Sequence, residues 1–269
     1  MSIKIRNMPQ REQSIEKTEE TLSITEMADA HCHLDLLGND EILKAIKYGV
    51  QIMISNGVDT RSNVEVLKLS DQRHIFAAIG IDPEHSLIGE DELEFNINLA
   101  KSNYGKLVAI GEIGLDAKFM TTQEAKDKQR YVFERFLELA IALNLPVSVH
   151  ARGAIGEVLD LLEEKGVKKA HLHFFEGSIE QAKRAERNGY MISIPPLKSS
   201  RRDRIIKNVA IDYIMAESDA PMAGKSPIDV EKSIQMVALA KGISFEKAAE
   251  TLLINTKRFF NIVPDIMRS

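Results

Sequence analysis

Short apolar runs alternate along this chain with longer segments in which apolar residues recur at helical spacing. The helical spacing is clearest at Phe133, Phe136, Leu137, Ala140 and Ile141, which follow an i, i+3, i+4, i+7, i+8 pattern. The short runs have the length and residue types of β-strands. We expect eight strands, at residues 27–31, 51–56, 75–81, 107–111, 146–150, 170–174, 190–194 and 213–218.

Strands that alternate with helices indicate βαβ units and a parallel sheet. Gly49, Gly166 and Gly189 each precede a predicted strand, where a helix should end. Capping boxes that begin at Thr121 and Ser178 predict two helix starts. Eight such units in about 240 residues match a closed (β/α)8 TIM barrel. An open, doubly wound sheet is the alternative, but no GxGxxG motif follows the first run.

The composition is typical of a globular protein, with 44% hydrophobic and 28% charged residues in a chain of 269. We expect one domain at residues 27–269, preceded by a short, polar N-terminal extension at residues 1–26. A net charge of −5 argues against a protein that coats nucleic acid by bulk charge, but leaves room for a local basic patch.

The single cysteine, Cys32, permits no internal disulfide and favours a reducing compartment. No apolar run approaches the roughly 20 residues that a membrane span needs. The polar start of the chain shows no signal-peptide pattern. We therefore expect a cytoplasmic protein without membrane contact, and nothing in the sequence indicates an oligomer.

Two histidines, His31 and His33, end the first predicted strand one residue apart. Side chains alternate faces along a strand, so both imidazoles point one way and Cys32 points the other way, into the core. Two imidazoles on one strand end can bind one divalent metal ion. The alternative is a pair of surface histidines on a loop.

Polar residues also end four other predicted strands, and in a TIM barrel these ends form the active site. Charged groups buried there would need a partner, and a divalent cation supplies one. The residues are Glu112 and Asp116, His150 and Arg152, His171 and His173, and Glu217 and Asp219.

The set fits two cations that share one carboxylate. His31, His33 and Asp219 with a bridging Glu112 would form one site, and Glu112 with His150 and His173 would form the other. Nitrogen and carboxylate ligands favour Zn, Mn, Ni or Fe over Ca. We expect two divalent metal ions, for which Zn, Mn, Mg and Ni are candidates, and the sequence does not specify which of them is native.

Each of these residues also has a purely structural interpretation. His150 could be a hydrogen-bonded rim histidine, and Glu112 could pair with an inward lysine. His171 lies one layer deeper than the predicted ligands and is expected to be a hydrogen-bonded core residue. Glu217 is expected to orient the ligating imidazoles. Asp219 is the expected proton shuttle for the attacking water.

Five motifs together resemble the TatD family of metal-dependent hydrolases, whose members include TatD-like DNases. The similarity runs from about residue 27 to residue 262, with the motifs in the family's order. The motifs are HCHLD at 31–35, GEIGLD at 111–116, PVSVHAR at 146–152, HFFEG at 173–177 and ESDAP at 217–221.

The resemblance implies a TIM barrel with two metal ions that hydrolyses phosphodiester bonds in DNA. By matching positions, it implies six metal ligands: His31, His33, Glu112, His150, His173 and Asp219. The chain departs from the family at Asp82, where a histidine is usual, and at Glu176, where a small hydroxyl residue is commoner. Both departures add negative charge near the expected phosphate.

Basic residues near the strand ends add positive charge that would attract a phosphate. Arg152 follows His150, and Lys198, Arg201, Arg202 and Arg204 follow the seventh predicted strand. Arginine forks fit phosphate oxygens, so Arg152, Arg201 and Arg202 are expected to bind substrate. The alternative for the cluster at 198–204 is a solvated helix start.

Three functions therefore stay open. The first, which we favour, is a two-metal phosphodiesterase or deoxyribonuclease that acts on DNA ends or short nucleotides through metal-activated water, with Glu112 and Asp219 as catalytic residues. The second is a metal-dependent hydrolase of an amide, ester or lactone. The third is a protein that keeps the metal site without catalysis.

Overall fold

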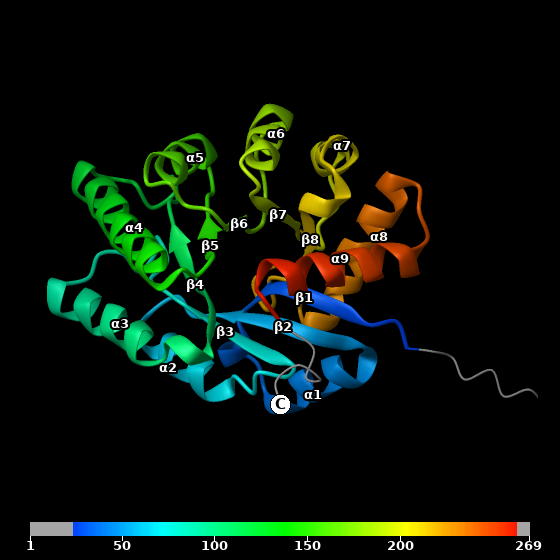
Figure 1. Ribbon diagram of the computed structural model, residues 1–269, viewed down its shortest axis with the longest axis horizontal. Coiled ribbons are helices and arrows are strands. Elements are labelled where there is room, and N and C mark those ends of the chain that lie inside the picture. Colours follow the sequence, from blue (N-terminus) through cyan, green and yellow to red (C-terminus); the bar gives the residue numbers. More distant parts are fainter. Residues whose placement is uncertain (1–23, 263–269) are drawn as a thin grey trace, which may run out of the picture.

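The chain forms one parallel sheet whose eight strands follow each other in sequence order. The computed structural model describes residues 24–262, and within them the sheet order is β1-β2-β3-β4-β5-β6-β7-β8 (Figure 1). The strands are β1 (Met27–Cys32), β2 (Val50–Asn56), β3 (Ile75–Ile79), β4 (Leu107–Gly114), β5 (Val147–His150), β6 (Ala170–Leu172), β7 (Met191–Ile194) and β8 (Ile214–Ala216). This order confirms the predicted TIM barrel, because a doubly wound sheet would reverse its strand order.

Helices surround the sheet on its outer side (Figure 1). They are α1 (Asn39–Tyr48), α2 (Thr60–Leu69), α3 (Glu90–Ser102), α4 (Gln123–Leu143), α5 (Ile155–Glu164), α6 (Ile179–Arg187), α7 (Ser200–Asn208), α8 (Val230–Lys241) and α9 (Phe245–Phe259). None of the helices in residues 24–262 is long and apolar enough to cross a membrane. The predicted extension at 1–26 lies almost entirely outside the described residues.

Local capping chemistry sets two of the helix starts. The Ser178 capping box is confirmed, because its side chain accepts from the Gln181 N–H at the start of α6. The box predicted at Thr121 is wrong by one residue. Thr122 is the N-cap of α4, and its hydroxyl accepts from the Ala125 N–H at 3.1 Å.

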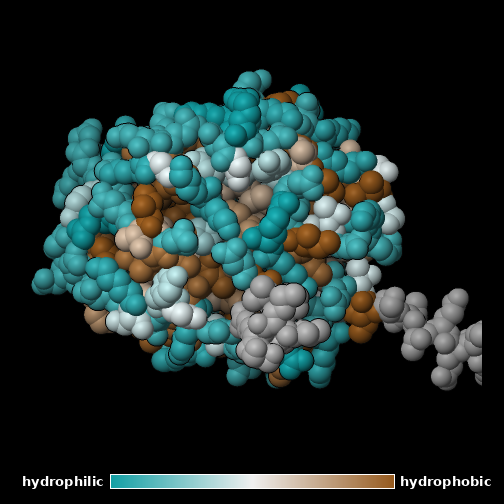
Figure 2. Space-filling model, viewed as in Figure 1, coloured by the Kyte–Doolittle hydropathy of each residue, from teal (hydrophilic) through white to brown (hydrophobic). Residues whose placement is uncertain are grey.

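Apolar side chains fill the space between the sheet and the helices. Phe133 and Phe136 of α4 are fully buried there, and Cys32 points into the same core, as its strand position predicts. Ile141, at the end of the predicted apolar stripe, is 48% exposed although the preceding Ala140 is buried, so the core-facing stripe of α4 does not include it. In Figure 2, hydrophilic residues cover the outer helices on this face and hydrophobic residues gather nearer its middle.

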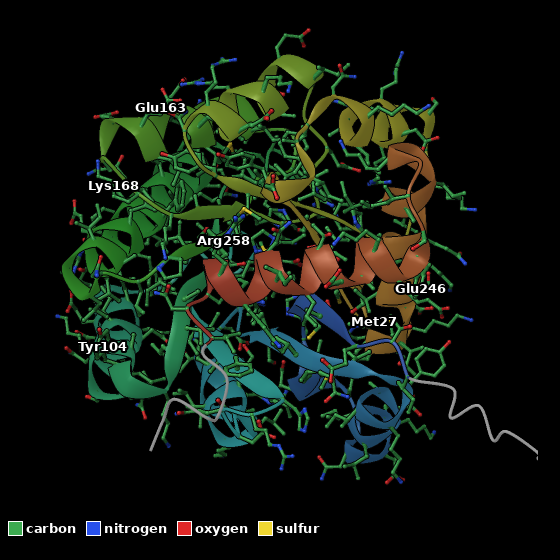
Figure 3. The ribbon with its side chains drawn as sticks, turned by 45° about the vertical axis from the view of Figure 1, so that its right-hand side comes forward. Met27, Tyr104, Glu163, Lys168, Glu246 and Arg258 are labelled. Atoms are coloured by element: carbon green, nitrogen blue, oxygen red, sulfur yellow. The ribbon has the colours of Figure 1, made fainter. Side chains whose placement is uncertain are left out.

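The end of α9 packs into a second apolar cluster, with residues from the strands. Phe259 and Phe260 are buried there together with Ala28, Ala30 and Phe76. Figure 3 labels Glu246 and Arg258 towards the two ends of α9, which lies beside the first strand. This packing leaves the carboxyl ends of the strands free to form a site.

The sheet closes between β1 and the residues that follow β8. The Asp219 N–H donates to the His31 carbonyl at 2.9 Å, and the His33 N–H donates to the Ala220 carbonyl at 2.8 Å. Since β8 itself ends at Ala216, the loop after it completes the barrel. We call these backbone contacts the β1–β8 seam. The seam brings Asp219 next to the HxH motif.

Candidate metal centre

Glu112, in β4, lies among four imidazoles that come from three other strand ends. Its Oε2 is 3.2 Å from His31 Nε2 and 3.7 Å from His33 Nε2. Its Oε1 is 2.8 Å from His173 Nε2 and 2.9 Å from His150 Nδ1. Each carboxylate oxygen therefore faces its own pair of imidazole nitrogens, which is the arrangement a carboxylate needs to bridge two cations.

Asp219 reaches this group from the β1–β8 seam, with its Oδ1 3.4 Å from His33 Nε2. Among the described residues, three groups of side chains are close enough to hold an ion, and Asp219 belongs to none of them. The groups are His31–His33–Glu112, Glu112–His150–His173 and His31–His173–Glu217. The first two correspond to the two predicted sites, and the third contains Glu217, which the sequence suggested only as a supporting residue.

The Glu112 carboxylate stays ionised although it is buried. Burial alone would raise the pKa of Glu112, but the neighbouring imidazoles of His173 and His31 and the hydrogen bond from His150 outweigh it and hold that pKa well below its usual range. Burial also disfavours the charged form of His150. Hydrogen bonds to Asp116 and Glu112 overcome this and raise the pKa of His150 to about 10.

The two histidines of the first motif behave in opposite ways. Burial disfavours charge on His33, but its hydrogen bond to Asp219 and the charge of Glu112 raise its pKa to about 9. Burial and the neighbouring His173 lower the pKa of His31 to about 4, so its ring is neutral. A neutral imidazole carries the lone pair that a metal ion needs.

Two buried imidazole nitrogens fit a cation for a further reason. Neither His31 Nε2 nor His173 Nδ1 has a hydrogen-bond partner within the described part of the chain. The two rings stack with centroids 3.8 Å apart. Buried polar atoms are nearly always paired, so unpaired nitrogens beside a carboxylate fit a missing positive partner.

A cavity of about 680 Å³ opens over these residues. His33, Glu112, His150, His173 and Asp219 line it, whereas His31 lies behind them and is fully buried. Among the described lining residues are eight carboxylates and three lysine or arginine side chains. Two divalent cations would offset most of this excess of negative charge.

Asp116 joins His150 to Arg152 at the cavity wall. Its carboxylate contacts His150 Nε2 and an Arg152 terminal nitrogen, each at 2.8 Å, and also accepts from Arg152 Nε at 3.0 Å. Burial would raise the pKa of Asp116, but the hydrogen bonds from His150 and Arg152 lower it to about 2. Asp116 thus orients both a predicted ligand and a predicted substrate arginine, a role that the sequence analysis did not assign.

Arg201 and Arg202, the two other arginines predicted to bind substrate, are not among the residues that line the cavity. Arg201 Nε donates to the Gly177 carbonyl at 3.1 Å. Arg202 is buried, donates to the Leu197 carbonyl at 2.7 Å, and pairs with Glu176 at 3.0 Å. In the structure both side chains hold neighbouring loops, and their role in substrate binding stays a prediction.

The two departures from the family pattern both contact basic side chains. Asp82 Oδ1 contacts His85 Nδ1 at 2.7 Å, and this hydrogen bond raises the pKa of His85. Glu176 pairs with Arg202 as described above. These contacts reduce the repulsion that the two acids would exert on a phosphate.

Asp29 is a buried residue that the sequence analysis missed. Its Oδ1 accepts from the Ser218 N–H at 2.8 Å, and its Oδ2 accepts from the Ser218 hydroxyl. Burial raises the pKa of Asp29 to about 7 despite these bonds. The sequence places Asp29 two residues before His31, which was the signal available, but the pairing of β1 with β2 is irregular between Asp29 and Cys32, so simple alternation does not apply there.

The family is decided by direct comparison. A model of the family described as TatD related DNase matches residues 28–261 of this chain. The chain belongs to the TatD family. This result confirms the resemblance found in the sequence and the predicted enzyme class, a deoxyribonuclease-like metal-dependent hydrolase.

Individual relatives are similar to this chain over most of their length. Deoxyribonuclease TATDN3 of Homo sapiens is 32% identical over 258 residues, which cover 87% of this chain and 94% of that protein. An uncharacterized metal-dependent hydrolase of Methanocaldococcus jannaschii is 29% identical, covering 86% and 96%. The crystal structure of the Escherichia coli K12 TatD homologue YjjV has a TM-score of 0.81 at 24% identity, covering 90% of this chain and 100% of that one, and has the same fold.

Proposed function

We propose that this TatD protein uses two divalent cations to hydrolyse phosphodiester bonds at DNA ends or in short nucleotides. The observation that supports it best is Glu112, each of whose oxygens faces a separate pair of imidazoles. The printed name of the relative TATDN3, a deoxyribonuclease, points to the same chemistry. Zn, Mn and Ni suit these imidazole and carboxylate ligands.

His31, His33 and Asp219 would hold one cation, and His150 and His173 would hold the other. When bound, the pair of cations would activate a water and neutralise charge on the phosphoryl oxygens. The Asp219 carboxylate lines the cavity and would take the proton of that water. Glu112 would keep the two halves of the site in fixed relation.

The cavity rim offers different chemistry on its two sides. Basic side chains follow β2 to β5, where Arg61, His85, Lys118 and Arg152 line the wall. Exposed apolar side chains follow β7, β8 and β1, where Leu197, Met222 and Leu36 are 43%, 70% and 55% exposed. A nucleotide has the matching division, with phosphate oxygens on one side and an apolar base face on the other.

The alternative substrate is an amide, ester or lactone. The acidic residues Asp82 and Glu176 would favour this substrate, because their charge would repel a phosphate. Because His85 and Arg202 pair with these two acids, that support is weakened. The half-exposed Arg152 fork, held by Asp116, favours a phosphate oxygen over a neutral carbonyl.

A substrate panel tests the proposal. The protein, stripped of metal and then reloaded with Mn, Mg, Zn or Ni, would be incubated with labelled DNA and with chromogenic esters and amides. We expect DNA products with at least one metal and none from the Asp219→Asn variant. Hydrolysis of esters or amides but not of DNA would favour the alternative. Metal binding without any hydrolysis would favour the non-catalytic function.

We also propose that the protein acts in the cytoplasm. Its single cysteine, Cys32, is a free and fully buried thiol. Burial raises the pKa of this thiol well above its ordinary value, which makes the thiol unreactive. Cell fractionation with a compartment marker would test the location.

A further inference from the structure

A row of four polar side chains crosses the interior of the barrel behind the candidate metal centre. Ser148 of β5, His171 of β6, Ser193 of β7 and Glu217, just after β8, are all completely buried. Branched apolar residues normally fill this layer of a TIM barrel. Four adjacent polar groups there need a specific explanation, because each would be costly if unpaired.

The four side chains form one continuous line of hydrogen bonds that ends at His31. Ser148 Oγ is 3.3 Å from His31 Nδ1 and 3.4 Å from His171 Nδ1. His171 Nε2 is 2.7 Å from Ser193 Oγ, and the Ser193 hydroxyl donates to Glu217 Oε2 at 2.6 Å. We call Ser148, His171, Ser193 and Glu217 the interior relay.

The far end of the interior relay is fixed by a second contact. The other oxygen of Glu217, Oε1, accepts from the Phe174 N–H at 2.7 Å. Burial raises the pKa of Glu217, so the direction of the row depends on the charge of this residue. As a carboxylate, Glu217 accepts at both oxygens, and the direction of every other bond in the row follows from this end. The two short bonds at Ser193 are also the strongest of the four by distance.

The direction is set by counting donors. If Ser193 donates to Glu217, its oxygen accepts from His171 Nε2–H, so Nδ1 of that neutral ring is an acceptor. Ser148 then donates to His171, and its own oxygen accepts from His31 Nδ1–H. The proton of the neutral His31 ring is thus on Nδ1, and Nε2 keeps a free lone pair.

We infer that the interior relay is a positioning device that holds His31 in the Nδ1–H tautomer, so that its Nε2 lone pair faces the cation site. This inference rests on the proposed function only in treating His31 as a cation ligand. The opposite tautomer is a real competitor, because Glu112 Oε2 lies 3.2 Å from His31 Nε2 and would accept a proton carried there. The unpaired state of Nε2 agrees with the relay direction.

The test measures the tautomer and the cation affinity separately. Long-range ¹H–¹⁵N spectra of the metal-free protein distinguish an Nδ1–H from an Nε2–H imidazole. Competition with a chromophoric chelator measures binding of Zn. We expect wild-type His31 to be the Nδ1–H form, and Ser148→Ala and Ser193→Ala to shift it towards Nε2–H and to weaken Zn binding about 10- to 100-fold.

Ser233→Ala is the control, because it also removes a fully buried hydroxyl, one in α8 that donates to the Ile194 carbonyl and not to a relay side chain. Thr256→Val in α9, whose hydroxyl donates to the Leu252 carbonyl, is a second control away from the relay. The conservative Ser193→Thr variant keeps the hydroxyl and should restore both readouts. If Ser193→Ala does not fold, Ser148→Ala tests the same row at its other end.

An Nε2–H tautomer in the wild type, or relay variants that match Ser233→Ala in both readouts, would overturn the inference. A wild-type protein that binds no Zn would instead count against the proposed function. The tautomer spectra need no cation, so they would still decide the role of the relay.

Discussion

At the scale of single residues, the character of the site depends on one carboxylate. Glu112 is the only described residue that contacts all four imidazoles of the motifs at 31–33, 150 and 173. A residue with one acceptor oxygen could serve one pair of imidazoles but not both. The other acids of the cavity each have a narrower role, as Asp116 does in orienting His150 and Arg152.

Replacing Glu112 by Gln tests this role with little change in shape. The amide would present an N–H₂ donor to one imidazole pair and would remove the negative charge. We expect cation affinity to fall at least about 100-fold and DNA hydrolysis to be lost. Glu176→Gln is the control, because its carboxylate also lines the cavity but pairs with Arg202. Equal effects of the two substitutions would contradict the bridging role.

Arg152 tests the substrate side of the cavity. Its guanidinium is half exposed and already oriented by Asp116, so it can reach a phosphate without further ordering. We expect Arg152→Met to lower kcat/KM for DNA about tenfold, the loss of one charge-assisted hydrogen bond. Arg201→Met, outside the cavity lining, should change kcat/KM much less. A larger effect at Arg201 would support the role that the sequence suggested for it.

At the scale of elements, the strands position the site and the loops adjust it. Alternation along β1 predicts that His31 and His33 share a face, and the parallel order brings distant strand ends together. The helix starts depend on single hydrogen bonds, so the sequence located one correctly at Ser178 and missed one by a residue at Thr121. The β1–β8 seam could not be predicted, because it uses loop residues beyond the last strand.

The side-chain contact between Ser218 and Asp29, beside the β1–β8 seam, should contribute to both stability and cation binding. Ser218→Ala removes the hydroxyl that Asp29 accepts from, and leaves a buried carboxyl oxygen without that partner. We expect the free energy of unfolding to fall by about 1–3 kcal/mol in urea titrations. Cation affinity should fall as well, because the same segment holds Asp219. If Ser218→Ala lowers the free energy of unfolding only as much as Ser233→Ala does, and leaves cation affinity unchanged, then this contact does not support the cation site.

The turn before β3 gives a pH dependence away from the site. Burial would raise the pKa of Asp71, but backbone N–H donors from Ile75, Arg73 and His74 lower it below its ordinary value. A lowered folded-state pKa adds stability above the unfolded pKa that is lost as pH falls through the folded pKa. We expect Asp71→Asn to be less stable near neutral pH by about 1 kcal/mol, after allowing for exposure. The difference should vanish in acid, and a gap that is constant with pH would contradict this.

At the scale of the whole molecule, the sequence predicted the barrel and the grouping of its polar strand ends, because both follow from periodicity and topology. It could not predict pairings such as Arg202 with Glu176 or Asp82 with His85, which depend on loop conformation. The sequence did predict His171 as a hydrogen-bonded core residue, but it did not connect it to Ser148 and Ser193, which look like ordinary strand residues. A modest net charge of −5 concealed a cavity in which carboxylates outnumber lysine and arginine side chains.

The number of metal ions per chain tests the central claim most directly. The purified protein would be equilibrated with Zn or Mn, passed over a desalting column, and analysed for metal and protein content. We expect about two ions per chain in the wild type, and fewer than one in Glu112→Gln, because both proposed sites share that carboxylate. A wild-type protein that retains no ion and hydrolyses DNA equally well in chelator would contradict the account.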